Sequence, residues 1–340
     1  MTYPAGCFIF LASFAALTGS FLLTYVLIKH ATTFRLIDKP NHRSSHLVPT
    51  ARGGGLSIVI AFITVSFVFY HFSSENAFIP YVLSLCILIA FTGFYDDLCS
   101  SSAFFRFTIQ CLLILALLGG LYFLTALNLK QALWIQIVFF TVLFFSGVWA
   151  VNLYNFMDGI NGFAALETIF VLFAAGITLA YQPSSHDIVY YMCFLGSAVA
   201  GFLYWNFPRA HIFMGDTGSL FLGFMICAFA FYTVLLHQIN FFSWLIWLAV
   251  FWVDATYTLL TRVAYKQVWY QAHCSHLYQC LSRQFQSHTK VVYLFSLYNL
   301  CWLLPLGFLV QIKPSFSPFA LALALLPLLS ASVYFKAGVP

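Results

Sequence analysis

The feature that most constrains this chain is a succession of apolar stretches separated by short polar segments. A helix needs about 20 apolar residues to cross the hydrocarbon core of a bilayer, and one stretch after another reaches that length. Charged residues make up only 7% of the chain, whereas they make up roughly 25% of an ordinary soluble domain. The sequence therefore predicts an all-α, polytopic transmembrane helical bundle, with 1–340 as a single domain and about eleven spans. The expected spans are 6–29, 53–72, 79–95, 104–124, 132–151, 163–181, 188–204, 220–237, 242–262, 291–311 and 317–335.

The distribution of Lys and Arg predicts which span ends face the cytoplasm, because basic residues near span ends resist translocation. With the N-terminus in the periplasm and the C-terminus in the cytoplasm, all of the 14 basic residues except Lys130 and Lys313 fall on the inner side. No Lys or Arg precedes the first span, so we expect an anchor rather than a cleavable signal peptide. The net charge of +5 then gathers on one face, which favours anionic headgroups and nucleotide phosphates, and not nucleic acid, as partners.

The acidic side chains lie at the ends of spans rather than at mid-membrane. Most of them fall in the longer, inner loops or near the inner ends of spans, and only Glu75 and Asp187 face outward. A transporter usually places its polar site near the midplane, on broken helices. The asymmetry therefore favours an enzyme that works at the cytoplasmic membrane surface. The nine cysteines show no metal-ligand spacing, and we interpret them as reduced thiols.

Two adjacent carboxylates, Asp96 and Asp97, end the third expected span in the run FTGFYDD. Adjacent carboxylates repel each other, so a divalent cation or a basic neighbour is needed to keep both ionised. A solvated span end is the alternative explanation for such a pair standing alone.

The run NLYNFMDGING follows the fifth expected span. On a helix, Asn152, Asn155 and Asp158 would share one face because they recur every three residues. Gly159 and Gly162 would then allow a sharp turn or a close approach of the backbone to a ligand. We interpret the run as part of a binding site, with a polar linker as the alternative.

The run WNFPRAHIFMGDTGS enters the eighth expected span. Asp216 lies between two glycines, and Thr217 and Ser219 are placed to cap the following helix, whose N-terminal amides favour an anion. A carboxylate at that point could bind Mg²⁺, which typically takes one or two carboxylates plus phosphates and waters. Phe213, judged alone, fits a membrane-interface aromatic as well as a ligand contact.

Two inner loops carry basic side chains suited to phosphate. In the run QAHCSHLYQ, His273 and His276 are three residues apart, which on a helix would put both imidazoles on one face. In the first inner loop, Arg43, His46 and Arg52 lie among serines and glycines in a basic, flexible segment. That segment is not a Walker loop, because the Lys-Ser/Thr ending is missing.

Taken together, the four ordered runs resemble the bacterial polyprenyl-phosphate N-acetylhexosamine-1-phosphate transferases, the superfamily that includes the MraY and WecA enzymes, and look most like its O-antigen-initiating branch. The resemblance extends from about Asp38 to Gln279. It implies transfer of an N-acetylhexosamine-1-phosphate from a UDP-N-acetyl sugar to undecaprenyl phosphate, release of UMP, and a need for Mg²⁺, with Mn²⁺ as an alternative. It also implies an inner-membrane protein among membrane lipids with its active site on the cytoplasmic face, and it leaves a homodimer open. The product would start O-antigen or related cell-envelope polysaccharide synthesis.

The same resemblance implies roles for individual residues. It assigns the paired catalytic aspartates to Asp96 and Asp97, the magnesium ligand to Asp216, the nucleotide pocket to Asn155, Asp158, Asn161 and Phe213, phosphate binding to Arg52, His273 and His276, and supporting positions to Asn152, Glu167 and Asp254.

Three positions depart from the family pattern. Ala51 stands where Pro is usual, Asn161 where Asp is usual, and Cys274 where Arg or His is usual. Asn161 keeps the hydrogen-bonding reach of Asp without its charge, and Cys274 lacks a phosphate-binding cation. The donor sugar is therefore left undetermined, and reduced activity is an alternative.

Other functions stay open at this point. A transporter or flippase for lipid-linked sugars would share the spans and the basic inner face, but it predicts charged residues at midspan, each costing about 2.5–3.5 kcal/mol on insertion scales. An inactive scaffold predicts tolerance of substitution at Asp97 and Asp216. For an enzyme, we favour direct attack by the lipid phosphate over a covalent aspartyl intermediate. A groove between spans is the expected site for the lipid chain.

Overall fold

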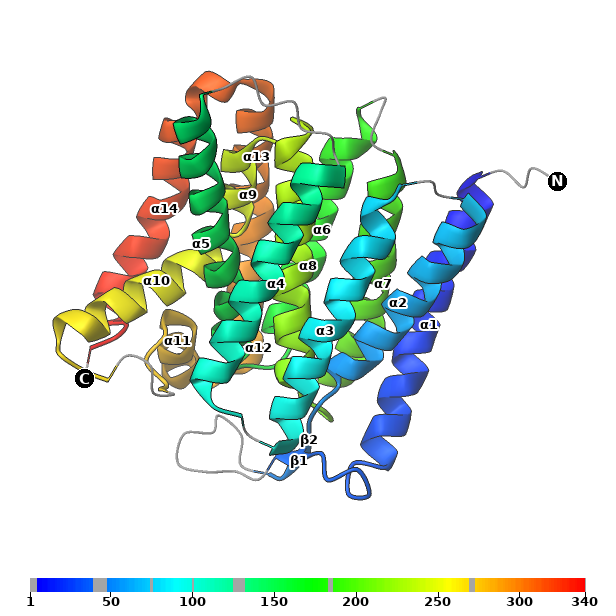
Figure 1. The fold of residues 1–340 in the computed structure, drawn as a ribbon. Coiled ribbons are helices and arrows are strands. Elements are labelled where there is room, and N and C mark those ends of the chain that lie inside the picture. The colour runs from blue at the N-terminus through cyan, green and yellow to red at the C-terminus, as the bar shows by residue number, and fades with distance from the viewer. Residues whose placement is uncertain are drawn as a thin grey trace.

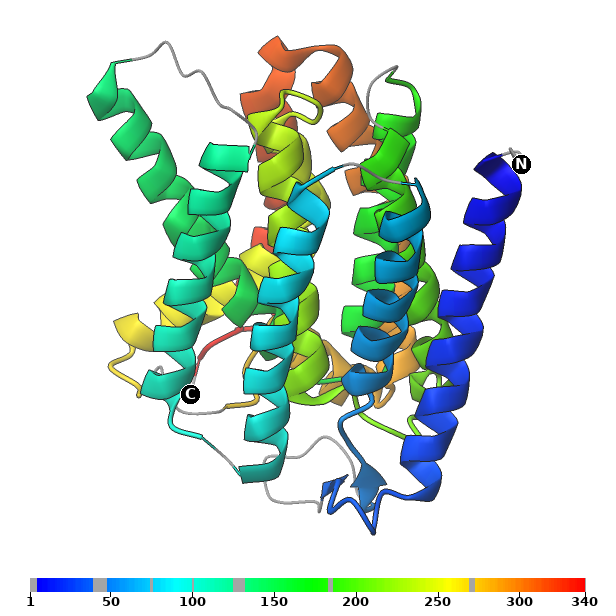
Figure 2. The same ribbon diagram turned by 45° about the vertical axis from the view of Figure 1, so that its right-hand side comes forward.

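The computed structural model, which describes residues 5–38, 48–73, 76–99, 101–124, 132–182, 186–268 and 273–339, is a bundle of long helices with almost no sheet (Figures 1 and 2). Ten helices are long and apolar enough to cross a membrane, and one bent pair brings the total to as many as eleven, as the hydropathy predicts. The two ends of the described chain lie at opposite ends of the bundle (Figure 1). The side of the membrane that each end faces stays a prediction.

Eight helices precede the bent pair. They are α1 (Ala5–Lys29), α2 (Gly55–Ser73), α3 (Phe78–Cys99), α4 (Ala103–Leu124), α5 (Leu133–Met157), α6 (Phe163–Ala180), α7 (His186–Asn206) and α8 (Gly215–Leu235). The later elements are α9 (Phe241–Trp247), α10 (Ala249–Ala264), α11 (Leu277–Phe285), α12 (His288–Tyr298), the π-helical turn η1 (Asn299–Leu303), α13 (Leu304–Ile312), the 3₁₀ turn η2 (Pro314–Phe316) and α14 (Ser317–Tyr334).

Helix α8 forms the centre of the bundle. It is buried along nearly its whole length and packs against α3, α5 and α2. A helix that is apolar all round, as α8 is beyond its first turn, can face either lipid or other helices, and α8 faces other helices. On one side α1 packs against α7 and α2, and on the other α10 packs against α14 and α5 (Figure 1). The first turn of α8, with Asp216, is thereby fixed at one end of the bundle.

The predicted span 242–262 is broken, which the apolar pattern did not reveal. Helices α9 and α10 meet at Leu248 with a bend of 74°. The backbone groups at the break are satisfied inside the protein: the Leu248 amide donates to the Trp244 carbonyl at 3.0 Å, and Trp252 Nε1 donates to the Leu245 carbonyl at 2.8 Å. Such satisfaction is what allows a helix to break at membrane depth.

Two predicted boundaries are also wrong, both by stopping the helix at its polar end. Helix α5 continues to Met157 rather than ending at 151, and α8 begins at Gly215 rather than at 220. Polar residues stay helical there because their side chains bond to each other, for example Asn155 to Asp216. The polar ends of the spans are therefore helical walls of the site.

A two-stranded sheet fixes the segment before α2. Strand β1 (Ile37–Asp38) pairs antiparallel with β2 (Thr50–Ala51), and Ala51 forms a parallel bridge with Ile212. The Phe213 amide donates to the Ala51 carbonyl at 2.8 Å. This arrangement brings the next residue along the chain, Arg52, to the loop that enters α8.

Candidate active site

A cavity of about 330 Å³ opens at the end of the bundle that carries β1 and β2 (Figure 1). Its walls come from β1, the segment before α2, the ends of α3, α5 and α7, the start of α8, and the segment before α11. The lining residues are Asp38, Arg52, Asp97, Asn155, Asp158, Gly159, Ile160, Asn161, Asn206, Phe213, Met214, Gly215, Asp216, His273, Cys274 and Gln279. Most of the residues that the sequence assigned to the nucleotide, the metal and phosphate are thus brought together.

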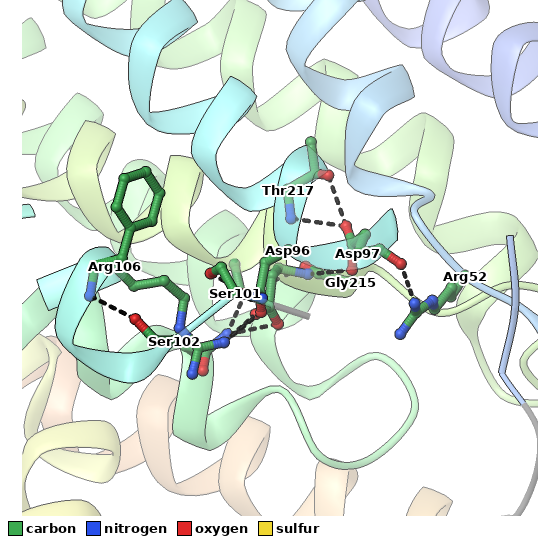
Figure 3. Close-up of polar contacts among 12 residues, drawn as sticks. Arg52, Asp96, Asp97, Ser101, Ser102, Arg106, Gly215 and Thr217 are labelled. Atoms are coloured by element: carbon green, nitrogen blue, oxygen red, sulfur yellow. Dashed lines mark hydrogen bonds and ion pairs between the residues drawn. The ribbon is translucent and has the colours of Figure 1, made fainter. Parts of the chain in front are cut away.

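Asp97, at the end of α3, caps the N-terminus of α8. Its Oδ1 accepts from the Asp216 amide at 3.0 Å, and its Oδ2 accepts from the Thr217 amide at 3.0 Å and from Thr217 Oγ1 at 2.7 Å (Figure 3). A carboxylate at this position also interacts favourably with the positive end of the helix dipole. Gly215 has a φ of +76°, and a Cβ there would lie 2.7 Å from Asp97 Oδ1, so both the turn and the close approach require glycine.

The expected capping of α8 by its own hydroxyls is wrong. No side chain of α8 caps that helix at its start. The Thr217 hydroxyl donates to Asp97 instead, and the Ser219 hydroxyl donates to the Gly215 carbonyl at 3.2 Å. A carboxylate from another helix takes the place of a local cap because it can accept from several donors at once.

Asp96 is held beside the cavity by the turn that follows it. Its Oδ1 accepts from both the amide and the hydroxyl of Ser101 at 2.6 Å, and Arg106 Nη1 forms an ion pair with its Oδ2 (Figure 3). The same Arg106 nitrogen lies 3.2 Å from Asp216 Oδ2. Arg106 therefore joins Asp96, one of the two predicted catalytic aspartates, to Asp216, the predicted metal ligand on α8. Asp96 itself does not line the cavity.

The two asparagines at the end of α5, Asn152 and Asn155, do not share one role. Asn155 Nδ2 donates to Asp216 Oδ1 at 2.9 Å and to Ser219 Oγ at 3.1 Å. Asn152 Nδ2 donates to Gln110 Oε1 on α4 at 2.7 Å, so it faces away from the cavity and supports helix packing. Each three-residue step turns a side chain by about 60° around a helix, and Asp158 follows the last helical residue, Met157, so the spacing did not put all three side chains on one face.

Arg52 and Phe213 approach the cavity from neighbouring backbone segments. Arg52 Nη2 donates to the Asp97 carbonyl, while Arg52 Nε is buried and has no hydrogen-bond partner within the described ranges. Asn161 also lines the cavity, and its Nδ2 donates to the Pro208 carbonyl at 3.3 Å. The cavity thus combines a cation, an aromatic ring and amide groups.

Residues His273–His276, which we call the histidine segment, precede α11 and are not helical. The prediction that helical spacing brings the two imidazoles together is therefore wrong. His276 is the N-cap of α11, and His273 precedes the helix, yet the two rings stack with centroids 4.8 Å apart. His273 lines the cavity, whereas His276 is buried with its Nδ1 3.3 Å from Asp254 Oδ1. Only one of the two imidazoles is therefore placed to meet a ligand.

Burial and neighbouring charges shift the pKa values of two side chains in the cavity wall. Burial, followed by repulsion from Asp216 and Asp97, raises the pKa of Asp158 well above its usual value. Burial, followed by the neighbouring His276, lowers the pKa of His273 to about 3, so this imidazole is neutral at physiological pH. A neutral imidazole can donate one hydrogen bond to an anionic ligand without carrying charge.

The donor set fits a divalent cation whose coordination is completed by phosphate. Asp97, Asp158 and Asp216 line one cavity. Within the described residues, no three His, Cys, Asp or Glu side chains are placed to hold a cation by themselves. Mg²⁺ usually needs only one or two carboxylates because substrate phosphates and water supply the rest. Asp216 fits best, because each of its oxygens retains a lone pair beyond its bond to Asn155 or Arg106.

A supporting residue predicted for the site lies away from the cavity. Glu167 is buried in α6, where its Oε2 accepts from Asn299 Nδ2 at 2.6 Å, and it is not part of the cavity wall. It ties α6 to η1. Arg43 and His46 fall outside the described residues, so their expected phosphate contacts stay predictions.

Sequence reasoning missed Arg106, which it counted only as an inner basic residue. A usable signal was present, because Asp96 and Asp97 stand at the C-terminal end of a helix, where a carboxylate opposes the dipole and needs a compensating partner. The arginine ten residues later, in the first turn of the next helix, is the natural candidate. Gln279, Asn206 and Asp38, which also line the cavity, carry no comparable signal in the sequence.

The chain is similar in sequence to a known family and to curated proteins. A family model described as "Glycosyl transferase family 4" matches residues 78–234, which include α3 to α8. Phospho-N-acetylmuramoyl-pentapeptide-transferases of Streptococcus pneumoniae serotype 2 (strain D39 / NCTC 7466) and serotype 19F (strain G54) are each 31% identical over 245 residues, covering 67% of this chain and 71% of the relative. The corresponding protein of Streptococcus pneumoniae strain CGSP14 is 30% identical over the same length.

Proposed function

The chain belongs to glycosyl transferase family 4, the superfamily of polyprenyl-phosphate hexosamine-1-phosphate transferases, and we propose that it transfers an N-acetylhexosamine-1-phosphate from a UDP-sugar to undecaprenyl phosphate. The observation that carries this proposal is that Asp97, Asp216, Arg52 and His273 line one polar cavity. Carboxylates that can hold a metal, combined with phosphate-binding side chains, are the combination that phosphoryl transfer needs.

The donor nucleotide is proposed to lie against Phe213, Asn155, Asp158 and Asn161. The ring of Phe213 offers a face for the base, and the amides offer donors and acceptors to its edge and to the sugar. Arg52 supports binding of the diphosphate, because its buried Nε lacks an acceptor among the described residues and a phosphate oxygen could supply one.

The reaction is proposed to be a direct displacement. An oxygen of the lipid phosphate attacks the β-phosphorus of the donor, the bond from that phosphorus to the bridging oxygen breaks, and UMP leaves with its electron pair. Asp97 is a poor nucleophile for a covalent route, since its two oxygens already accept three hydrogen bonds from Asp216 and Thr217. Its role is to keep the attacking phosphate deprotonated and to fix the start of α8.

Mg²⁺, with Mn²⁺ as a substitute, is the proposed cofactor, and Asp216 would hold it. When bound, the cation would neutralise the negative charge that the donor and acceptor phosphates bring together. Asn155 and Arg106 orient the Asp216 carboxylate through its two oxygens. Arg106 also balances the charge of Asp96, so that three carboxylates can share this end of the bundle.

A segment of the lipid chain is proposed to lie in an apolar cavity of about 160 Å³ between α5, α8, α9 and α10. Its lining includes Trp149, Trp244 and Trp252, and the bend at Leu248 borders it. Helix α5 contributes to both cavities, because Tyr154 lines the apolar one and the next residue, Asn155, lines the polar one. Quenching of tryptophan fluorescence by brominated lipid tails should therefore decrease when undecaprenyl phosphate binds, and unchanged quenching would contradict this placement.

The lipid-linked diphosphosugar is proposed to start O-antigen or related cell-envelope polysaccharide synthesis at the cytoplasmic face of the bacterial inner membrane. The curated relatives are named for one particular group, a phospho-N-acetylmuramoyl-pentapeptide. The cavity departs from the family pattern at Asn161 and Cys274, which supports a donor other than theirs. A homodimer is compatible with this activity and is not needed for it.

Two rival functions make different predictions. A transporter usually has broken helices in matching halves, whereas within the described residues only the α9–α10 pair is broken. An inactive scaffold would tolerate loss of Asp97 or Asp216. Such tolerance is not expected here, because Asp97 accepts three hydrogen bonds from the start of α8 and Asp216 accepts from Asn155 on α5 and Arg106 on α4.

The test is release of UMP from a panel of UDP-N-acetyl sugars by purified protein with undecaprenyl phosphate and Mg²⁺. We expect lipid-dependent release from at least one donor, and we expect Asp216→Asn to abolish it. Asp187→Asn is the matched control, because Asp187 lies in the first turn of α7 and does not line the cavity. Absence of release from every donor, or equal release by Asp216→Asn and the control, would contradict the proposal.

A further inference from the structure

The chain segment after α14, Phe335–Val339, folds back onto the histidine segment; we call it the tail segment. Gly338 donates its amide to the Ser275 carbonyl at 2.8 Å, and Gln267 Nε2 donates to the Gly338 carbonyl at 3.1 Å. Ala337 is fully buried. The tail segment is therefore packed against the residues between α10 and α11 and does not extend into solvent.

Ser275, which accepts a hydrogen bond from the tail segment, also contacts the ring of His273. The Ser275 hydroxyl lies 3.0 Å from His273 Nδ1, and the Ser275 amide donates to the same nitrogen at 3.4 Å. Because Nδ1 accepts from an amide, the proton of the neutral ring resides on Nε2. Ser275 thus fixes both the orientation of the ring and the nitrogen that can donate to a ligand.

The histidine segment is also held from its other side. Asp254 Oδ1 accepts from the Leu277 amide at 2.8 Å, and Oδ2 accepts from the Tyr278 amide at 3.0 Å, so a carboxylate of α10 caps α11. These bonds fix His276 and the start of α11. His273 also stacks on His276, and Cys280 Sγ lies 3.8 Å from the Ser275 carbonyl oxygen, but the backbone amide that donates to this carbonyl is that of Gly338 in the tail segment.

Gly338 allows the tail segment to pack closely against α10. Its φ is +77°, and a Cβ there would lie 2.6 Å from the Thr258 carbonyl oxygen and 2.9 Å from Thr261 Cβ. Any other residue at this position would be strained twice, by its backbone conformation and by the backbone of α10. A side chain at Gly338 therefore displaces the tail segment from Ser275.

We propose that the tail segment is a positioning element of the active site, which keeps His273 at the cavity by holding Ser275. The proposal rests on the proposed function in one respect, that His273 contacts the donor diphosphate. The remaining contacts that support it are those of Gly338, Gln267 and Ser275.

The first measurement is the rate at which diethylpyrocarbonate modifies His273, followed by mass spectrometry, with the exposed His30 as internal reference. We expect Gly338→Ala to raise the ratio of the two rates by about fivefold or more, the factor expected when a non-glycine residue is forced to a positive φ. Gly119→Ala is the matched control, because a Cβ at Gly119 meets no atom within 4 Å. A ratio unchanged from wild type in folded Gly338→Ala would overturn the inference.

The second measurement compares UMP release by the same variants. We expect Gly338→Ala to raise the KM for the UDP-sugar, whereas Gly119→Ala should leave it unchanged. If Gly338→Ala does not fold, Gln267→Met removes the other tail contact, and the same two changes are expected with smaller size. Failure of wild type to release UMP would refute the proposed function alone, since modification of His273 still reports on the tail segment. Normal KM and normal modification in both variants would refute the positioning role alone.

Discussion

The hydroxyl of Thr217 provides the sharpest test of the arrangement around Asp97. It donates to Asp97 Oδ2 at 2.7 Å, while two backbone amides donate to the same carboxylate at 3.0 Å. Thr217→Val keeps the shape of the side chain and removes only this donor. A hydrogen bond to a charged group is worth about 1.5–3 kcal/mol, and the two remaining amides place this one at the lower end, about 1.5–2 kcal/mol. If the whole of this free energy is lost from the stabilisation of the transition state, kcat falls by about 10- to 30-fold.

The assay is UMP release at saturating UDP-sugar, compared with two other variants. Thr217→Ser retains the hydroxyl and should recover most of the activity. Thr178→Val is the matched control, because the Thr178 hydroxyl donates to the Ala174 carbonyl of its own helix at 2.9 Å, away from the cavity. If Thr217→Val retains a kcat within about twofold of the control, a difference of under about 0.5 kcal/mol, the reasoning about Asp97 is wrong.

Three further predictions concern the neighbours of the cavity. Arg106→Gln leaves Asp96 without its cation and should lower UMP release by about 10- to 100-fold, the effect of losing charged hydrogen bonds; release equal to wild type would contradict it. The pKa of His273 is lowered from 6.5 in the unfolded chain to about 3 in the folded protein. As pH falls below about 6.5, the ring is therefore protonated in the unfolded chain but not in the folded one, so the stability that the neutral ring contributes is complete above about pH 6.5 and is lost as pH falls toward about 3. His273→Gln should therefore show a smaller drop in melting temperature between about pH 7 and pH 5 than wild type, and an identical drop would refute the shift. Tyr278→Phe removes a hydroxyl that donates to the Phe156 carbonyl at 3.0 Å and should lower unfolding free energy by about 1 kcal/mol, measured by thermal denaturation in detergent; an unchanged melting temperature would count against that bond.

Hydropathy was sufficient to predict the spans, because every helix in hydrocarbon must present apolar side chains over about 20 residues. It could not predict the bend at Leu248, since both arms of the broken span are apolar and the stabilising bond from Trp252 depends on tertiary packing. It also placed the end of the fifth span too early, because the apolar run stops at Asn152 although the helix continues to Met157 and Asn155 donates to Asp216.

The residue types of the site were predictable, while the contacts among them were not. Asp97, Asp216 and His273 were each recognised from short runs, and they line one cavity. The cap that Asp97 provides to α8 joins residues more than a hundred positions apart, so no local pattern reveals it. The spacing of His273 and His276 led to a helical interpretation, whereas His276 is an N-cap fixed by Asp254.

The measurement that tests the central claim most directly uses a UDP-N-acetyl sugar carrying radioactive phosphorus in its β-phosphate. Transfer of a sugar-1-phosphate moves that phosphorus to undecaprenyl phosphate and leaves UMP unlabelled. We therefore predict labelled lipid in the organic phase and unlabelled UMP in water, both lost in Asp216→Asn. Label recovered in UDP, with an unlabelled glycolipid, would show transfer of the sugar alone. Label that stays in the intact donor for every sugar tested would contradict transferase activity altogether.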